Sequence, residues 1–142
     1  MNESVINKSN NKNNTSEKND LKEQKENKLK LIPKAEEYIY YMLLVINKLP
    51  RTEKFNIGNE YKNSMYEMLE KIMLISKIKD VYILDCLNYI DAKLNTQRIY
   101  LRIMKKERWI DEKKFNVAMS LIYEMGKILG GLIKYYGKNN KK

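Results

Sequence analysis

The sequence of 142 residues predicts an all-α protein, an up-down-up-down antiparallel four-helix bundle that is preceded by a disordered polar tail. Apolar residues recur with helical spacing in four segments, and no segment shows the sustained alternation of a β-strand. The first 30 residues hold only five apolar side chains, too few to offset the entropy lost on ordering the segment. We therefore expect a disordered Asn/Lys-rich tail over 1–33, the bundle over 34–137 and a basic C-terminal tail over 138–142.

Two prolines delimit the first predicted helix. Pro33 suits a helix start, where its missing N–H would be unpaired in any case. The helix should end before Pro50, because the residue that precedes a proline is pushed out of the helical region. The apolar stripe of this helix consists of Ile39, Met42, Leu43, Ile46 and Leu49.

The second predicted helix begins at Thr52, whose hydroxyl can cap the free N–H groups of the first turn. Gly58 lies near its start, where glycine costs about 1 kcal/mol relative to alanine. We therefore expect another helix to pass close to Gly58. The apolar stripe consists of Phe55, Ile57, Tyr61, Met65, Met68, Leu69, Ile72 and Ile75.

Aspartates mark the starts of the last two predicted helices. Asp80 is the expected cap of a third helix that extends to about Arg108, and Asp111 is the expected cap of the fourth. Gly130 and Gly131 lie late in the fourth helix, where two small residues favour the close approach of another backbone. Short connections between four such helices favour antiparallel packing.

Composition excludes several classes of function. The chain contains no histidine and only one cysteine, Cys86, so a His/Cys metal site and an intramolecular disulfide are both excluded. A catalytic cysteine would lack a histidine base, and no glycine-rich phosphate loop is present. The longest apolar runs, 38–46 and 128–133, are shorter than the roughly 20 residues of a membrane span. We expect a cytoplasmic protein that is not an enzyme, has no cofactor and does not enter a membrane.

Positive charge is the strongest functional signal. The formal net charge is +10, and most of the excess lies beyond the predicted tail. Five cations, Arg98, Arg102, Lys105, Lys106 and Arg108, crowd the end of the third predicted helix, and the first four share one face. Cations complement the dipole at a helix C-terminus, but this explains one or two of them and not five. These residues are the predicted nucleic-acid contacts, extended by Arg51, Lys54 and Lys134.

Two further expectations concern packing. Asp91 lies between apolar positions, so we expect a partly buried carboxylate that pairs with Arg98. Apolar residues off the core stripes predict subunit interfaces, because a lone bundle would expose them. These residues are Tyr82, Tyr89, Ile99 and Ile103 on the third helix, and Tyr38, Tyr41 and Val45 on the first.

Three segments resemble the accessory variability determinant (Avd) proteins of diversity-generating retroelements. The run 49–58, LPRTEKFNIG, is similar to a turn of that family, and Asp91, Arg98 and Arg102 are similar to one of its helices. The stretch from Trp109 through DEKKF to EMGKILGGLIK at 124–134 resembles the family's C-terminal block. The likeness covers about 35–136, with Leu132 where the family usually has tryptophan and Lys127 where it often has arginine.

This resemblance implies a four-helix bundle that assembles into a basic, barrel-like homopentamer. It also implies binding to the element's reverse transcriptase and template RNA, in support of mutagenised cDNA synthesis (mutagenic retrohoming). The four-helix protein encoded in ribosomal RNA intervening sequences shares the bundle and the charge and remains an alternative. A second alternative is an oligomeric scaffold that binds an acidic protein, which a salt-sensitive protein complex without affinity for RNA or DNA would reveal.

Overall fold

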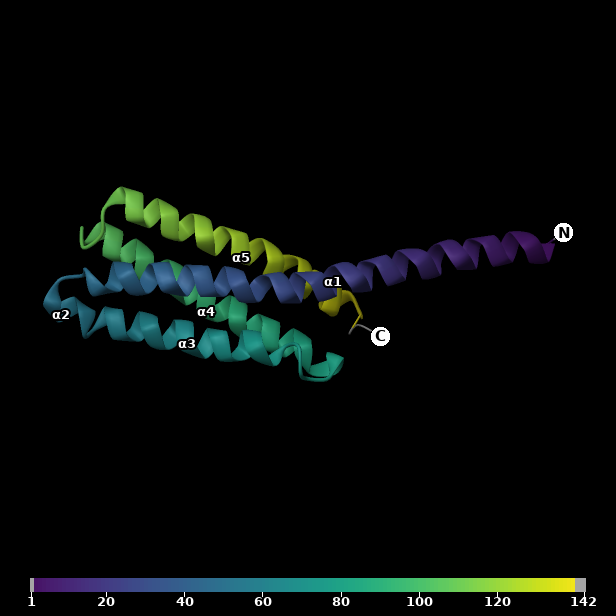
Figure 1. The fold of residues 1–142 in the computed structure, drawn as a ribbon, viewed down its shortest axis with the longest axis horizontal. Coiled ribbons are helices and arrows are strands. Elements are labelled where there is room, and N and C mark those ends of the chain that lie inside the picture. Colours follow the sequence, from purple (N-terminus) through teal and green to yellow (C-terminus); the bar gives the residue numbers. More distant parts are fainter. Residues whose placement is uncertain (1, 140–142) are drawn as a thin grey trace.

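The computed structural model describes residues 2–139, with side chains from 14 onward, and this part of the chain contains helices and no strand. Four long helices, α1 (Asn2–Asn47), α3 (Ile57–Leu74), α4 (Asp80–Lys106) and α5 (Glu112–Asn139), are joined by short connections, with a one-turn helix α2 (Arg51–Lys54) between α1 and α3. The chain reverses direction from each long helix to the next (Figure 1). The predicted all-α bundle is therefore confirmed.

The core lies along the inner faces of the four long helices. α5 packs against both α1 and α4, and α4 packs against α3. Methionine and branched aliphatic side chains dominate the fully buried set, which includes Met42, Met65, Met68, Ile72, Leu87, Leu94, Ile122 and Leu129. Met42, Met65, Met68 and Ile72 belong to the apolar stripes predicted for the first two helices, because burial of one stripe per helix drives the packing.

The first helix does not begin at Pro33, in contrast to the sequence-based expectation. Instead α1 begins at Asn2 and runs through Pro33 to Asn47. Leu31 is fully buried and Gln24 is almost so, which places packing contacts ahead of the proline. Tertiary packing on both sides of Pro33 can offset the hydrogen bond that its ring removes. The disorder expected over 1–33 stays a prediction, but the bundle's packing starts before that boundary.

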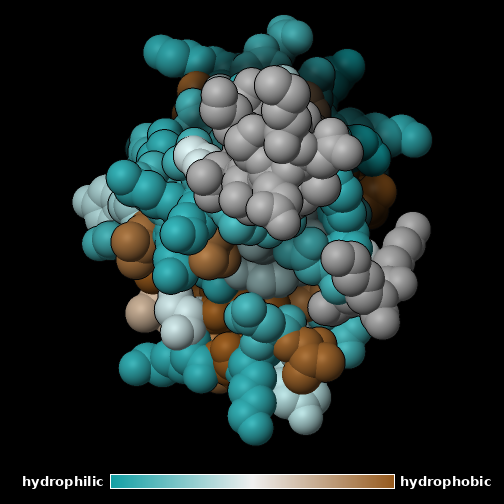
Figure 2. Space-filling view, turned by 90° about the vertical axis from the view of Figure 1, so that its right-hand side faces the viewer, coloured by the Kyte–Doolittle hydropathy of each residue, from teal (hydrophilic) through white to brown (hydrophobic). Residues whose placement is uncertain are grey.

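The extended α1 also shapes the molecule. Its N-terminal part projects beyond the rest of the bundle (Figure 1). Seen from that side, hydrophilic residues cover much of the visible surface, with hydrophobic side chains between them (Figure 2). At the other end of the chain α5 continues to Asn139, and the remainder of the predicted basic tail, 140–142, lies outside the described residues.

The connection between α1 and α3 contains the short helix α2, whereas the sequence predicted one helix that begins at Thr52. Thr52 is not a cap, because α2 follows Pro50 and α3 follows Asn56. Phe55 lies in the break between the two helices and is 66% exposed, so its place in the predicted core stripe is wrong. The expected close approach at Gly58 is confirmed: a methyl group there would meet Ile46 Cγ2 at 3.0 Å and the Glu53 carbonyl oxygen at 3.1 Å.

The two predicted aspartate caps have different outcomes. Asp111 caps α5, since the backbone N–H of Lys114 donates a 2.7 Å hydrogen bond to Asp111 Oδ1. Lys79 precedes α4 without a side-chain cap, and Asp80 is a residue of the first turn. An acid there still complements the helix dipole. Within the described chain, no atom of another helix lies within 4 Å of a methyl group placed at Gly130 or Gly131, so the approach expected there is absent.

Two of the residues expected at an interface are part of the core. Tyr38 and Val45 are buried inside the single chain, and Tyr41 is half-buried. The four residues named on α4 are exposed: Tyr82, Tyr89, Ile99 and Ile103. The sequence therefore located the exposed apolar surface of α4 correctly and misplaced that of α1, whose inner face is wider than a single stripe.

Candidate nucleic-acid interface

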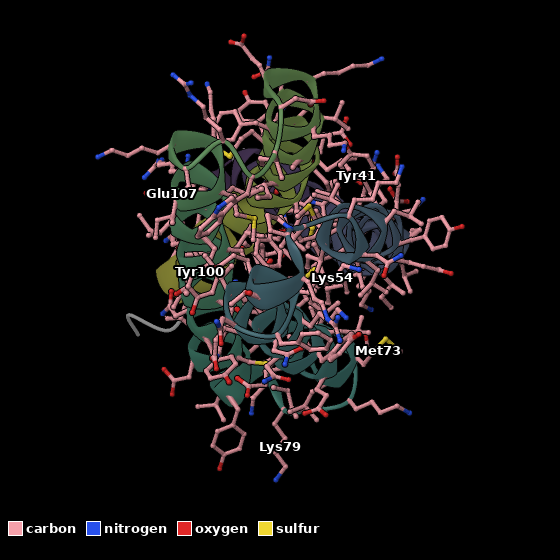
Figure 3. The ribbon with its side chains drawn as sticks, turned by 90° about the vertical axis from the view of Figure 1, so that its left-hand side faces the viewer. Tyr41, Lys54, Met73, Lys79, Tyr100 and Glu107 are labelled. Atoms are coloured by element: carbon pink, nitrogen blue, oxygen red, sulfur yellow. The ribbon has the colours of Figure 1, made fainter. Side chains whose placement is uncertain are left out.

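One end of the bundle gathers most of the predicted cations. The α1–α2–α3 connection and the α4–α5 connection lie at the same end of the molecule (Figure 1). We call the residues 47–57 and 105–115 at this end the turn end. It holds eight lysines and arginines against four carboxylates, whereas residues 14–30 of α1 hold five lysines against four carboxylates. Figure 3 looks onto this end, with Lys54 and Glu107 labelled on its two connections.

The last turns of α4 present the largest part of the cationic surface. Arg102, Lys105 and Lys106 are exposed, and their spacing places them on one face of the helix. The ammonium group of Lys105 lies 4.3 Å from the centre of the Phe115 ring on α5. This cation–π contact links the two helices at the turn end and holds Lys105 in place.

The α4–α5 corner has a defined backbone conformation. The N–H of Trp109 donates to the Met104 carbonyl at 2.9 Å, and the N–H of Arg108 donates to the Lys105 carbonyl at 3.0 Å. These two bonds form a Schellman motif, in which the residue after the cap adopts positive φ. That residue is Arg108, with φ 62°, and its side chain is exposed. Ile110 is buried, so the corner is anchored to the core while Arg108 faces outward.

The other connection adds cations from α2. Arg51 is exposed and Lys54 is half-buried on this single turn. Three further cations of the turn end were not among the sequence-based candidates: Lys48, Lys113 and Lys114. The aspartate cap at Asp111 was the signal that could have indicated the last two, since it places them in the first turn of α5. Positive charge there opposes the helix dipole, so the dipole does not explain their position.

Arg98 is set apart from the exposed cations. It lies eight residues before Lys106, about 12 Å along the helix axis, and it is half-buried. Its guanidinium donates a hydrogen bond to Asn95 Oδ1 and covers Gly126 of α5, where an added methyl group would meet Arg98 Nη2 at 2.9 Å. Arg98 is therefore held between α4 and α5.

The expected ion pair between Asp91 and Arg98 is not formed. Asn95 stands between them, because its amide group donates to Asp91 Oδ2 at 3.4 Å while its oxygen accepts from Arg98. A spacing of seven residues puts the two charged groups about 10 Å apart along the axis, and a polar residue one turn from Asp91 fills the gap.

Lys134 lies apart from the other candidates. It is exposed and follows the first residue of α5 by 22 positions, about 33 Å along the helix axis. The structure thus brings together six of the eight predicted contacts at or next to the turn end: Arg51, Lys54, Arg102, Lys105, Lys106 and Arg108.

Carboxylates do not neutralise these cations. Over residues 14–139 the side-chain ion pairs within 4 Å are Lys34–Glu124 at 2.8 Å and Lys93–Glu67, both remote from the turn end in sequence. Neither pair includes any of the eight predicted contacts. The turn end therefore presents positive charge that is free to meet an anion.

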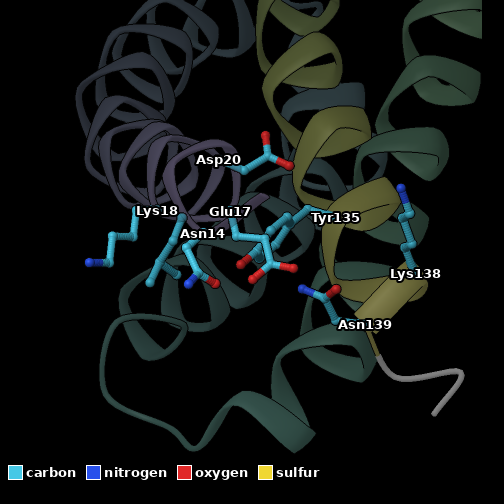
Figure 4. A pocket seen from close by; sticks show the side chains of 8 residues that line it. Asn14, Glu17, Lys18, Asp20, Tyr135, Lys138 and Asn139 are labelled. Atoms are coloured by element: carbon cyan, nitrogen blue, oxygen red, sulfur yellow. The ribbon is translucent and has the colours of Figure 1, made fainter. Parts of the chain in front are cut away.

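Two hollows lie elsewhere on the molecule. One, of about 590 Å³, opens between the N-terminal part of α1 and the end of α5 and is lined by both signs of charge, including Glu17, Asp20, Lys18 and Lys138 (Figure 4). Mixed charge does not select an anion. The other, of about 290 Å³, is an apolar groove between α1 and α3 lined by Ile32, Glu36, Ile39, Tyr40, Leu43 and Leu69.

No helix in the described part of the chain is long and apolar enough to cross a membrane. No significant match is found among curated protein sequences. The sequence model of one family, described as bAvd-like, matches residues 29–136, which include α1 from residue 29, all of α2, α3 and α4, α5 up to residue 136 and the whole turn end. Because this match covers about three quarters of the sequence, the chain belongs to the bAvd-like family.

Proposed function

We propose that this protein is a non-enzymatic accessory subunit of a diversity-generating retroelement, which binds template RNA or cDNA and associates with the reverse transcriptase during mutagenic retrohoming. The observation that carries this proposal is the group of exposed cations at the turn end, none of which forms an ion pair within the described chain. Membership of the bAvd-like family supports the accessory role.

The proposed contacts are electrostatic. Arginine forks at Arg102, Arg108 and Arg51 match the geometry of phosphate oxygens, and Lys54, Lys105 and Lys106 add point charges around them. On this proposal Arg98 positions α4 against α5 and reaches the ligand only at its edge. Lys134 contacts a ligand only if the ligand extends along α5.

We also propose that the protein is a homo-oligomer, with a pentamer favoured by the family. Ile99 and Ile103 are exposed one turn apart on α4, and the groove between α1 and α3 is apolar. Surfaces of this kind mark interfaces more often than solvated faces. Light scattering tests the proposal, which a stable monomer of 17.0 kDa at micromolar concentration would refute.

A charge-reversal experiment tests RNA binding. Replacement of Arg102, Lys105 and Lys106 by glutamate should weaken RNA binding more than tenfold at low salt and flatten its salt dependence, because each lost phosphate contact removes about 0.7 from the log–log slope for a single strand. The matched control replaces Lys18, Lys22 and Lys25 of α1 by glutamate, which changes the net charge by the same amount. An equal loss of RNA affinity in both variants would show that net charge alone determines binding and would contradict the proposed site.

Association with the polymerase is tested separately. Copurification of the reverse transcriptase with the wild-type protein after nuclease treatment is the expected result. A salt-sensitive complex with an acidic protein, together with no affinity for RNA or DNA, would instead support the scaffold alternative.

A further inference from the structure

Phe55 is an exposed aromatic residue within the cationic turn end. Its side chain is 66% exposed, although a phenylalanine gains stability from burial. Among the described residues, its ring makes none of the ring or cation–π contacts that Phe115, Tyr61 and Tyr89 make. Most of the Phe55 side chain is therefore available to a ligand.

The backbone around Phe55 is held in place. The Asn59 side chain donates a 3.0 Å hydrogen bond to the Phe55 carbonyl, and the N–H of Asn56 donates to the Glu53 carbonyl at 3.2 Å. The N–H of Lys54 in turn donates to the Pro50 carbonyl at 3.0 Å. A ring on a fixed backbone loses little conformational entropy when it binds a flat partner.

Cationic residues adjoin Phe55 in the sequence of this connection. Lys54 precedes it, Arg51 lies one turn earlier, and Lys48 follows the end of α1. Glu53 is the one carboxylate of this connection. The charge specifies an anionic partner, and the bare ring specifies a partner with an accessible flat apolar face.

We propose that Phe55 is a stacking platform for an unpaired base, with Arg51 and Lys54 on the adjoining phosphates, so that the turn end selects single-stranded over duplex nucleic acid. This inference rests on the proposed function. Bases inside a duplex are stacked on one another, whereas bases of single strands and loops can lie flat on an aromatic side chain. Such stacking tolerates any sequence, because every base has a π-face.

The test compares Phe55→Leu, Phe55→Ala and Phe55→Trp. Binding of a fluorescently labelled oligouridylate and of an RNA duplex of equal length is measured by anisotropy at low salt. We expect Phe55→Leu and Phe55→Ala to weaken single-strand binding about tenfold, as the loss of one stacked base predicts, and to change duplex binding less than twofold. Phe55→Trp should retain single-strand binding. Thermal unfolding should be unchanged in all three variants, since the ring is exposed.

Tryptophan fluorescence can report the contact between residue 55 and a base directly. Trp109 is the single tryptophan of the chain, so Phe55→Trp combined with Trp109→Phe carries one reporter at the proposed platform. Oligouridylate should quench its fluorescence, and the duplex should not. The absence of quenching on bound oligouridylate would overturn the proposal.

The remaining outcomes separate this inference from the proposed function. If Phe55→Leu binds oligouridylate as tightly as the wild type, or loses affinity equally for the single strand and the duplex, the stacking platform is overturned. RNA binding by the protein is not contradicted by either result. A changed oligomeric state in Phe55→Ala identifies the ring as a subunit contact and also overturns the platform. If the wild-type protein binds neither oligouridylate nor duplex, the proposed function itself fails.

Discussion

The hydroxyl group of Tyr38 on α1 donates a 2.7 Å hydrogen bond to Oε1 of Gln97 on α4, and both side chains are fully buried. The Gln97 amide donates in turn to Ser64 Oγ on α3 at 3.1 Å, and the Tyr61 hydroxyl hydrogen-bonds to that of Tyr38. Three helices are thus joined by one polar network. Across the described chain, every buried side-chain nitrogen and oxygen has a hydrogen-bond partner. A network of this kind specifies one register of the helices.

Replacement of Gln97 by leucine should destabilise the protein by about 1–3 kcal/mol, because the hydroxyl groups of Tyr38 and Ser64 lose a buried partner. Replacement of Tyr38 by phenylalanine removes the other side of the same bond. Urea unfolding of both single variants and the double variant should give a coupling energy of at least about 0.5 kcal/mol. Strictly additive effects would show that the two residues act independently.

Alkaline pH should weaken the fold through its buried tyrosines. Burial, with a smaller effect from the Asp80 carboxylate, raises the pKa of Tyr136 to about 12. The unfolded chain ionises its tyrosines near pH 10, so it loses protons before the native state does. The contribution of Tyr136 to stability should be constant below about pH 10 and fall between about pH 10 and 12, by up to roughly 1.4 kcal/mol per pH unit.

Urea unfolding at several alkaline pH values tests this prediction. Tyr136→Phe should show a shallower loss of stability above pH 10 than the wild type. Tyr123→Phe is the matched control, since Tyr123 is exposed and should leave the profile unchanged. Parallel profiles for all three proteins would contradict the assignment to Tyr136.

Two glycines should respond to alanine with opposite signs. At Gly58 the added methyl group meets Ile46 and the Glu53 carbonyl, so Gly58→Ala should destabilise by about 1–3 kcal/mol. At Gly130 the methyl group meets nothing within 4 Å, so Gly130→Ala should stabilise by up to about 1 kcal/mol through helix propensity. Thermal unfolding under one condition measures both changes. A loss of stability in Gly130→Ala would reveal that a second subunit covers that position.

The sequence predicted most of the fold because the information is local. Helical spacing within each segment identified the buried faces, and Asp111 caps α5 as expected because a cap depends on residues three positions apart. The predicted helix start at Pro33 is wrong, since the local preference of proline for a helix start is outweighed by packing of Leu31 that only the tertiary structure reveals. Phe55 was misplaced because the break after α2 shifts the helical phase.

The candidate site was predictable in composition but not in arrangement. The cations of α4 could be assigned to one face from spacing alone. Their meeting with Arg51 and Lys54 depends on the antiparallel topology, which follows from the resemblance and from short connections. The interposed Asn95, and the close contact of Arg98 with Gly126, depend on the fit of α4 on α5, and no sequence pattern carries that geometry.

Replacement of Arg108 should affect the stability of the fold and the affinity for RNA in opposite directions. Its φ of 62° is a conformation that favours glycine and strains an L side chain by about 1 kcal/mol or more. Arg108→Gly should therefore stabilise the fold by about 0.5–1 kcal/mol, the strain relief exceeding the added freedom of the unfolded chain. The same change should weaken RNA binding several-fold, because it removes an exposed guanidinium from the turn end.

Arg108→Lys is the matched control, since lysine keeps the charge and the strain while it loses the planar fork. We expect its unfolding temperature to equal that of the wild type and its RNA affinity to fall between those of the wild type and Arg108→Gly. The unfolding temperature comes from thermal melts and the affinity from anisotropy in one buffer. If Arg108→Gly gains stability but binds RNA as tightly as the wild type, Arg108 is not part of the RNA interface. The Schellman corner would then have only a structural role.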